Sequence, residues 1–189
     1  PDKSWILYRD GKWQAVVDPG ETNRTGADDM KFLDGDTVGS AVNGTVDPGL
    51  KEAPAKLELT DDWAAADYLV DPQDASKIRV FAAEAEPDRT DTVDGATVKH
   101  YTQTSVADIA NKGTDVTDMF DIKVEGTVAT ATAKAGYLTT LKGMRKGLQL
   151  TLLVPFTVNF ADGKGAARVR EDFGRQPGDE VTLCNSPDG

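Results

Sequence analysis

Three polar residues of types that can react with one another lie at the edges of apolar, alternating stretches of the chain: Lys3, Asp61 and Asn185. In the closing stretch VTLCN, Asn185 follows Val181 and Leu183 at a spacing of two. Because side chains alternate between the two faces of a strand, this spacing predicts an amide on the same face as two aliphatic side chains. Lys3 in KSWILY and Asp61 in KLELTD are predicted to lie beside apolar neighbours in the same way.

An amine, a carboxylic acid and a carboxamide in one apolar pocket could form a covalent bond. Burial disfavours the charged form of lysine, which makes the neutral nucleophile available, and it keeps a carboxylic acid protonated. A protonated Asp61 could donate a hydrogen bond to the carboxamide oxygen while Lys3 attacks Asn185 and ammonia leaves. The product would be an intramolecular isopeptide bond. The unreactive alternative makes Lys3 a chain-terminal residue, Asp61 a helix cap and Asn185 a turn former before SPDG.

The length and composition of the chain suit one globular domain. It has 189 residues, of which 39% are hydrophobic, with 18 Gly and 9 Pro, as in domains built mainly of strands and turns. A formal net charge of -11 disfavours nucleic acid as a ligand, because phosphate binding needs a basic excess. No signal peptide, transmembrane run or sorting segment is apparent. We therefore expect a single domain, residues 1–189, excised from a longer protein and not embedded in a membrane.

Conventional enzymatic chemistry finds little support. Cys184 is the only cysteine and His100 the only histidine, which excludes an internal disulfide and a Cys/His zinc cluster. No G-x-S-x-G, H-E-x-x-H or phosphate-loop motif is present. We interpret His100 as a surface residue and Cys184 as unreactive, since no cationic partner is evident. The domain is therefore expected not to be an enzyme that turns over an external substrate, and a hydrolase is disfavoured.

Clusters of acidic residues raise the question of a calcium site. None of them follows the EF-hand pattern, and solvated loops explain each one. A structural calcium assembled from two loops is an open alternative, whereas no cofactor is required. The clusters are Asp28-Asp29, Asp34 with Asp36, Asp61-Asp62, and Asp115 with Asp118 and Asp121.

Alternation and turn residues predict a chain of short strands. A hairpin is expected at Asp10-Gly11, because this dipeptide separates two apolar runs, and another at Asp94-Gly95. Pro155, within a long strand over 148–160, indicates a bulge or an edge position. Further predictions are a surface connection over 18–36, strands at 37–46, 56–60 and 77–85, two strands meeting at Gly126, and a hairpin at Asp162-Gly163 before a closing strand over 180–185.

Short helices are expected between the strands. DDWAAADYLV fits a helical turn that opens at an Asp cap, and SVADIANK fits a helix ending at Gly113, with a second brief turn capped by Thr114 or Asp115. AKAGYLTTLKGM has helical spacing and a stop at Gly143. Eight or nine short strands with a few helices favour a β-sandwich over a parallel α/β sheet.

Three motifs resemble the isopeptide-forming C-terminal stalk domains of antigen I/II-type Gram-positive surface adhesins. The motifs are NKGTDVTDMFDIKVEGTVATATAKAGYLTTLKG at 111–143, LELTDDW at 57–63, and the terminal CNSPDG. They cover most of the chain in the family's order. The resemblance implies a mainly β, variant immunoglobulin-like sandwich of the DEv-IgG type with added helices. Cys184 and the high Asp and Ala content depart from the streptococcal pattern, and an actinobacterial version would explain that composition.

The resemblance also implies which residues react. The family's lysine falls on Lys3, its catalytic aspartate on the Asp61-Asp62 pair, and its asparagine on Asn185. We choose Asp61 because it is in phase with the apolar residues of its strand, with Asp62 as the fallback. The early alignment is loose, so Lys12 is a lesser rival to Lys3.

The resulting hypothesis is a stalk module of a cell-wall-anchored, extracellular adhesin. Its partners would be neighbouring domains of the same adhesin and, through the full-length protein, a host surface or other bacteria. The alternative is a module that binds a host ligand or a carbohydrate on the same sandwich, which exposed aromatic residues would support. The candidates are Trp13, Trp63 and Tyr68.

Overall fold

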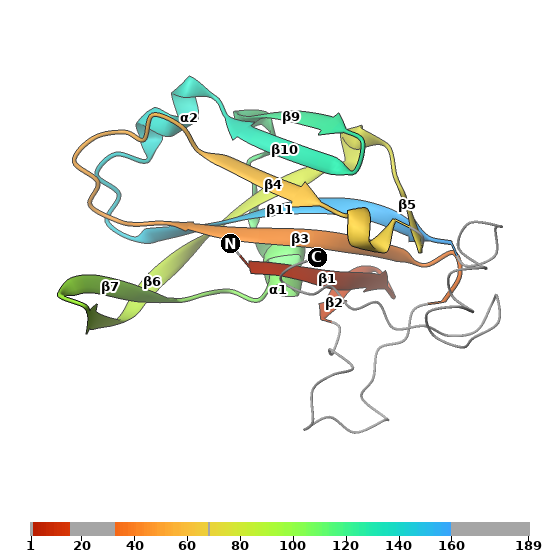
Figure 1. The fold of residues 1–189 in the computed structure, drawn as a ribbon, viewed down its shortest axis with the longest axis horizontal. Coiled ribbons are helices and arrows are strands. Elements are labelled where there is room, and N and C mark those ends of the chain that lie inside the picture. Colours follow the sequence, from red (N-terminus) through yellow and green to blue (C-terminus); the bar gives the residue numbers. More distant parts are fainter. Residues whose placement is uncertain (1, 16–32, 68, 160–189) are drawn as a thin grey trace, which may run out of the picture.

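The computed structural model describes residues 2–15, 33–67 and 69–159 (Figure 1). These residues form two antiparallel sheets packed as a sandwich, with short helices between the strands. The predicted closing strand with Cys184 and Asn185, the predicted hairpin at Asp162-Gly163 and most of the predicted surface connection over 18–36 lie outside the described residues.

The larger sheet has eight strands, six of them in the order β2-β1-β3-β11-β6-β7. Two short strands, β5 and β8, pair with β11 and β6 respectively. The bounds are β1 Asp2–Arg9, β2 Lys12–Ala15, β3 Thr37–Val46, β5 Val70–Pro72, β6 Arg79–Val93, β7 Ala96–Thr102, β8 Thr114–Asp115 and β11 Gly147–Val158.

The smaller sheet has three strands in the order β4-β10-β9 and covers one face of the larger sheet (Figure 1). Its strands are β4 Glu58–Asp62, β9 Phe120–Glu125 and β10 Val128–Ala133. The α-helices are α1 Val106–Lys112 and α2 Ala135–Thr140, and short 3-10 helices span Ala64–Ala66, Ala75–Lys77 and Thr117–Met119. The predicted mainly β sandwich with inserted short helices is confirmed. The described part has eleven strands rather than eight or nine, because short pairings such as β5 and β8 carry little sequence signal.

Alternation along β1 divides its side chains between two apolar clusters. Trp5 and Leu7 face the smaller sheet and join the main core, whereas Ile6 points to the opposite face. There Ile6 packs with Ala107 of α1, so that the helix covers this part of the larger sheet. The period-two pattern of the sequence therefore places Lys3, which is in phase with Trp5, on the face that meets the smaller sheet.

Both predicted Asp-Gly hairpins are confirmed. The φ angles are 57° at Asp10 and 77° at Gly11, and 49° at Asp94 and 79° at Gly95. Two successive residues with positive φ make the tight turn whose twist matches that of the flanking strands, and Asp followed by Gly adopts it readily. The first hairpin fixes the register of β1 against β2, with Tyr8 opposite Trp13.

The prediction that Pro155 marks a bulge or an edge is wrong, because it lies in the central strand β11 and pairs in register with Gly39. On the other side of β11, pairing with β6 ends at Leu153 and pairing with β5 begins at Phe156. The Pro155 carbonyl accepts a hydrogen bond from the Gln73 backbone N–H at 3.1 Å on that side. The missing N–H of Pro155 therefore faces a junction between two partner strands, where its absence breaks no ladder bond.

Helix α1 is held at both ends and along its side. Its first turn is capped by the Ser105 hydroxyl, which accepts a hydrogen bond from the Asp108 N–H, and Gly113 ends it as predicted. The Asn111 side chain accepts from the Trp13 N–H at 2.8 Å and donates to the Trp13 carbonyl at 2.9 Å. This amide therefore pairs with the outer edge of β2 as a neighbouring strand would.

A buried glutamine orders the segment that leads into α1. The Gln149 side chain, which is fully buried, accepts from the Thr104 N–H at 2.9 Å and donates to the Thr104 carbonyl at 2.8 Å. Buried backbone groups outside a sheet need such partners, because an unmade hydrogen bond in the interior is costly.

No helix among residues 2–15, 33–67 and 69–159 has the length and apolar character needed to cross a bilayer.

Candidate functional site

Asp61 points into the sandwich, as its phase in the sequence predicts. Strand β4 alternates between exposed and buried residues, and Leu59 and Asp61 are its buried members. Asp61 is only 1% exposed and lies between Leu59 and the buried Trp63. A carboxyl group in this position is removed from water by the packing of two sheets. Burial of an acid to this extent is uncommon unless the group is paired or functional.

Lys3 reaches this carboxyl group from the other sheet. Its Nζ atom lies 3.3 Å from Oδ1 of Asp61, and the Lys3 side chain is 14% exposed. The same nitrogen donates a hydrogen bond to the backbone carbonyl of Asp62. Residues far apart in the chain are thus brought together by strand β1 of the larger sheet and strand β4 of the smaller one. The structure brings together the lysine and the aspartate that the sequence predicted as partners.

The environment of Asp61 shifts its protonation equilibrium towards the neutral form. Burial raises the pKa of Asp61, and this effect outweighs the Ser40 hydroxyl and the Lys3 ammonium, which both favour the carboxylate. A carboxyl group whose pKa is raised in this way holds its proton more strongly than an exposed aspartate does. This is the property expected of a general acid in a dry site.

Four buried side-chain atoms at this site lack a hydrogen-bond partner among the described residues. They are the indole Nε1 of Trp5, the hydroxyl of Ser40 and both carboxyl oxygens of Asp61. Asp61 and Lys3 are thus in ionic contact without a hydrogen bond of normal geometry. The sequence analysis did not single out Ser40 or Trp5 as site residues. The spacing of two between Lys3 and Trp5 was the one available signal, whereas nothing in TVGSAVNGTV distinguishes Ser40.

Asp62, the fallback acid, faces the opposite way. Its side chain is exposed, and Oδ1 accepts hydrogen bonds from the Ala64 N–H at 3.0 Å and the Thr127 hydroxyl at 2.9 Å. Asp62 therefore caps the turn that follows β4, which is the role that the unreactive interpretation gave to Asp61. Lys12, the rival to Lys3, is exposed on β2.

Asn185 lies outside the described residues, so its place in the site stays a prediction. The asparagines within the described part have other partners. Asn43 accepts a hydrogen bond from Thr151, and Asn111 pairs with the backbone of Trp13. Asn159 donates to Asp71 at 2.6 Å.

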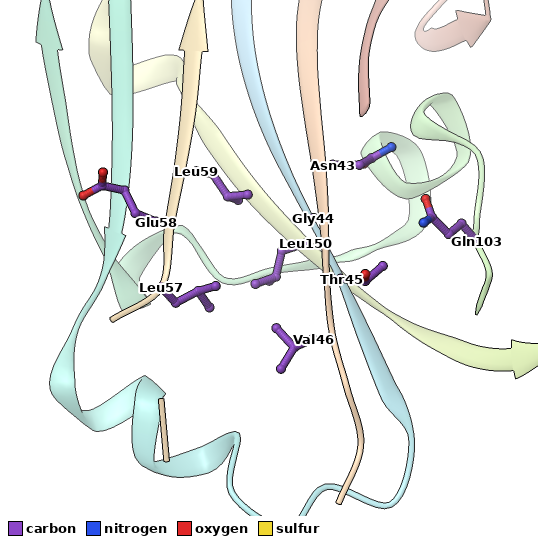
Figure 2. A pocket seen from close by; sticks show the side chains of 9 residues that line it. All are labelled: Asn43, Gly44, Thr45, Val46, Leu57, Glu58, Leu59, Gln103 and Leu150. Carbon is purple, nitrogen blue, oxygen red and sulfur yellow. The ribbon is translucent and has the colours of Figure 1, made fainter. Parts of the chain in front are cut away.

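A pocket of about 460 Å³ lies between β3 of the larger sheet and β4, the strand that carries Asp61. Leu57, just before β4, and Leu59 of β4 point towards Val46 and Leu150 across the gap between the sheets, and Glu58 points away (Figure 2). Leu59 is next in phase to Asp61, so the apolar lining runs up to the carboxyl group.

The acidic clusters proposed as calcium ligands have other partners where they are described. Asp36 accepts from the Arg9 guanidinium at 2.7 Å, and Asp115 accepts from the Thr117 N–H at 2.9 Å. The second contact sets the Asp115 carboxylate at the start of the turn after α1, although the cap position of that turn is Val116 and not Thr114 or Asp115 as predicted. No group of three or more acidic, His or Cys side chains within the described ranges is arranged to hold a metal, and Asp28-Asp29 lies outside them.

The remaining candidate residues serve other purposes. His100, predicted at the surface, has a half-exposed side chain whose Nε2 lies 2.8 Å from the Asp91 carboxylate. Trp63, predicted as an alternative ligand-binding aromatic, is instead a core residue that packs edge-on against Phe156 at 5.1 Å. Trp13 is half-buried and lines a pocket of about 300 Å³ with Tyr8. The side chain of Tyr68 lies outside the described part.

Comparison with known proteins gives distant structural likenesses alone. No family model and no curated protein matches the chain. Among solved structures, the chain is similar to the pilus backbone protein RrgB of Streptococcus pneumoniae, with 9% sequence identity and a TM-score of 0.39. The match covers 84% of this chain and 46% of that chain, so the chain spans less than half of the pilus protein's length.

Proposed function

We propose that the domain is a structural stalk module of a cell-wall-anchored bacterial adhesin, cross-linked by an autocatalytic isopeptide bond between Lys3 and Asn185. The ion pair between Lys3 Nζ and Asp61 Oδ1, at 3.3 Å between the two sheets, carries this proposal. An amine and an acid in such a position are costly to keep charged. A reaction that turns the amine into a neutral amide removes that cost permanently.

The proposed reaction begins with proton transfer from the Lys3 ammonium to Asp61. The neutral Nζ then attacks the side-chain carbonyl carbon of Asn185, and a tetrahedral intermediate forms. Asp61 gives its proton to the departing amide nitrogen and takes up the remaining proton from the attacking nitrogen. The new C–N bond replaces the old one, so that an amine and a carboxamide become a secondary amide and ammonia. No external substrate is consumed, and the domain is not an enzyme in the usual sense.

A bond between Lys3 and Asn185 would close nearly the whole chain into a ring. By the entropy model used for disulfides, a ring of this length stabilises the fold by about 5 kcal/mol. A force applied at the ends of the domain would run through the covalent link and bypass most of the sandwich. The module would then extend little under load, as a stalk requires.

The setting that suits such a module is the outer surface of a bacterium. Proteases and shear act together there, and kinetic resistance to unfolding matters more than equilibrium stability. A chain whose only cysteine is Cys184 has no disulfide of its own for this purpose. The proposed partners are neighbouring domains of the same adhesin, with a host surface or other bacteria contacted through the full-length protein.

Intact mass spectrometry of the denatured domain tests the proposal. The wild-type mass is expected to be short by one ammonia, and peptide mapping should find Lys3 joined to Asn185. Lys3→Ala and Asn185→Ala are expected to restore the full mass. Lys12→Ala is the matched control, because Lys12 is exposed, and it should still lose one ammonia. A wild-type domain of full mass would refute the proposed function.

A further inference from the structure

The unpartnered polar atoms of the described part are concentrated at one place. Buried polar groups in folded proteins almost always have hydrogen-bond partners, so each exception needs an explanation. Here the buried side-chain atoms without a partner among the described residues belong to Trp5, Ser40 and Asp61 alone. Trp5 is 5% exposed, Ser40 is fully buried and Asp61 is 1% exposed.

Strand pairing places these groups on the same side of the larger sheet. Trp5 of β1 is directly opposite Ser40 of β3, so their side chains project from the same face at close range. Lys3 is in phase with Trp5, and its Nζ reaches Asp61 from that face. The Ser40 hydroxyl lies near enough to the Asp61 carboxyl group to favour its charged form as a hydrogen-bonding neighbour, but it makes no hydrogen bond of normal geometry there. The indole, the hydroxyl and the amine therefore project from one face of the larger sheet, the face that the Asp61 carboxyl group meets.

The chemistry of these groups selects the missing partner. The Trp5 indole N–H can only donate a hydrogen bond, and the Ser40 hydroxyl can donate one as well. A protonated Asp61 adds a third donor. What the region lacks is an acceptor that can take several hydrogen bonds, and a carbonyl oxygen that becomes negatively charged during a reaction is the strongest such acceptor.

We propose that Trp5 Nε1 and Ser40 Oγ donate hydrogen bonds to the carboxamide oxygen of the reacting asparagine and stabilise the negative charge that develops on it. This inference rests on the proposed isopeptide chemistry. As Lys3 attacks, the carbonyl double bond opens and its electron pair moves to the oxygen that the two donors hold. When ammonia leaves, the electron pair returns and the same donors hold the oxygen of the new amide. Both donors are thus satisfied in the product.

The rate of ammonia loss tests this role in the full chain. Wild-type domain purified after a brief induction would be incubated, and its intact mass followed with time. Trp5→Phe keeps a ring against Phe156 but removes the N–H, and Ser40→Ala removes the hydroxyl. Each is expected to slow ammonia loss by about a hundred- to a thousand-fold, as the loss of one such donor does in enzymes. Trp63→Phe is the matched control, since Trp63 also packs on Phe156 but its indole N–H is not among the unpartnered atoms.

The melting temperature of fully reacted domain separates a chemical from a structural role. If Trp5→Phe and Ser40→Ala lower the melting temperature but lose ammonia as fast as Trp63→Phe, the two groups only pack, and the inference is overturned. Slow ammonia loss in these variants with a control at the wild-type rate supports it. A wild-type domain that never loses ammonia refutes the proposed function itself, which is a different result from equal rates in all variants.

Discussion

Lys3 of β1 and Asp61 of β4 form an ion pair of 3.3 Å that joins the two sheets of the sandwich. Both residues lie within regular strands, so their positions are fixed by backbone pairing and by the core around them. A site built on strands holds its groups more accurately than one built on loops. The pair is therefore positioned by the two sheets themselves.

The choice between the two adjacent aspartates can be tested by amide substitution. Asp61→Asn is expected to abolish ammonia loss, because the inward-facing acid is the only one of the two that contacts the Lys3 side chain through its carboxyl group. Asp62→Asn should react normally, because an amide oxygen can still accept the hydrogen bonds from Ala64 and Thr127. Intact masses measured after long incubation give the answer. Full mass in Asp62→Asn and lost ammonia in Asp61→Asn would reverse the assignment.

The buried acid also predicts a pH dependence in a domain that cannot cross-link. The folded-state pKa of Asp61 is raised above its usual value by burial, so the folded domain binds the proton more tightly than the unfolded chain does. Its contribution to stability is therefore complete in acid and is lost as the pH rises through the folded pKa. The test compares two variants that cannot cross-link, Lys3→Met and Lys3→Met/Asp61→Asn. When the pH is raised from about 4.5 to about 7.5, the free energy of unfolding should fall further in Lys3→Met, which keeps the buried acid, than in the double variant. Urea unfolding at both pH values measures this, and parallel curves for the two proteins would contradict it.

Trp63 is predicted to be essential to the core and not to a binding surface. It is 2% exposed, so Trp63→Ala should lower the free energy of unfolding by about 3–5 kcal/mol. Tyr8→Ala, at a residue that is 43% exposed, should cost about 1 kcal/mol or less. Both are best measured by denaturant unfolding in an Asn185→Ala background, where no ring closure adds to the stability. Equal losses would show that Trp63 is not the core anchor described above.

Two glycines should respond to alanine in opposite directions. A Cβ at Gly147 would lie 2.4 Å from the Ala85 carbonyl oxygen and 2.9 Å from the Tyr101 ring, so Gly147→Ala is expected to cost about 1–3 kcal/mol. At Gly136, inside α2, no atom lies within 4 Å of the added Cβ. Gly136→Ala should stabilise the domain by about 0.5–1 kcal/mol, because alanine favours the helix. Thermal unfolding of the two variants side by side checks the signs.

Local features of the fold were accessible from the sequence because their causes are local. The Asp-Gly turns need only two residues with positive φ, and the inward phase of Asp61 follows from alternation in one strand. The preference for Asp61 over Asp62 as the buried residue was therefore predictable. The helix end at Gly113 followed from its own residue type in the same way.

Features that depend on the pairing of strands far apart in the chain could not be predicted from the sequence. Pro155 suggested an edge because a proline removes a ladder bond, yet two different strands meet beside it and no bond is missing. Ser40 gained its place in the site only because β3 pairs with β1 in a register that sets it opposite Trp5. That register is a property of the assembled sheet and not of either strand alone.

The side-chain amide of Asn111 makes hydrogen bonds with both the backbone N–H and the carbonyl of Trp13. These bonds affect how neighbouring copies of the domain can associate. An open sheet edge is a template on which another chain can add a strand, and this is a common route to aggregation. On β2 an incoming strand would first have to pull α1 away from the sheet. Many copies of the domain could therefore lie side by side at high density without forming intermolecular strand pairs through this edge.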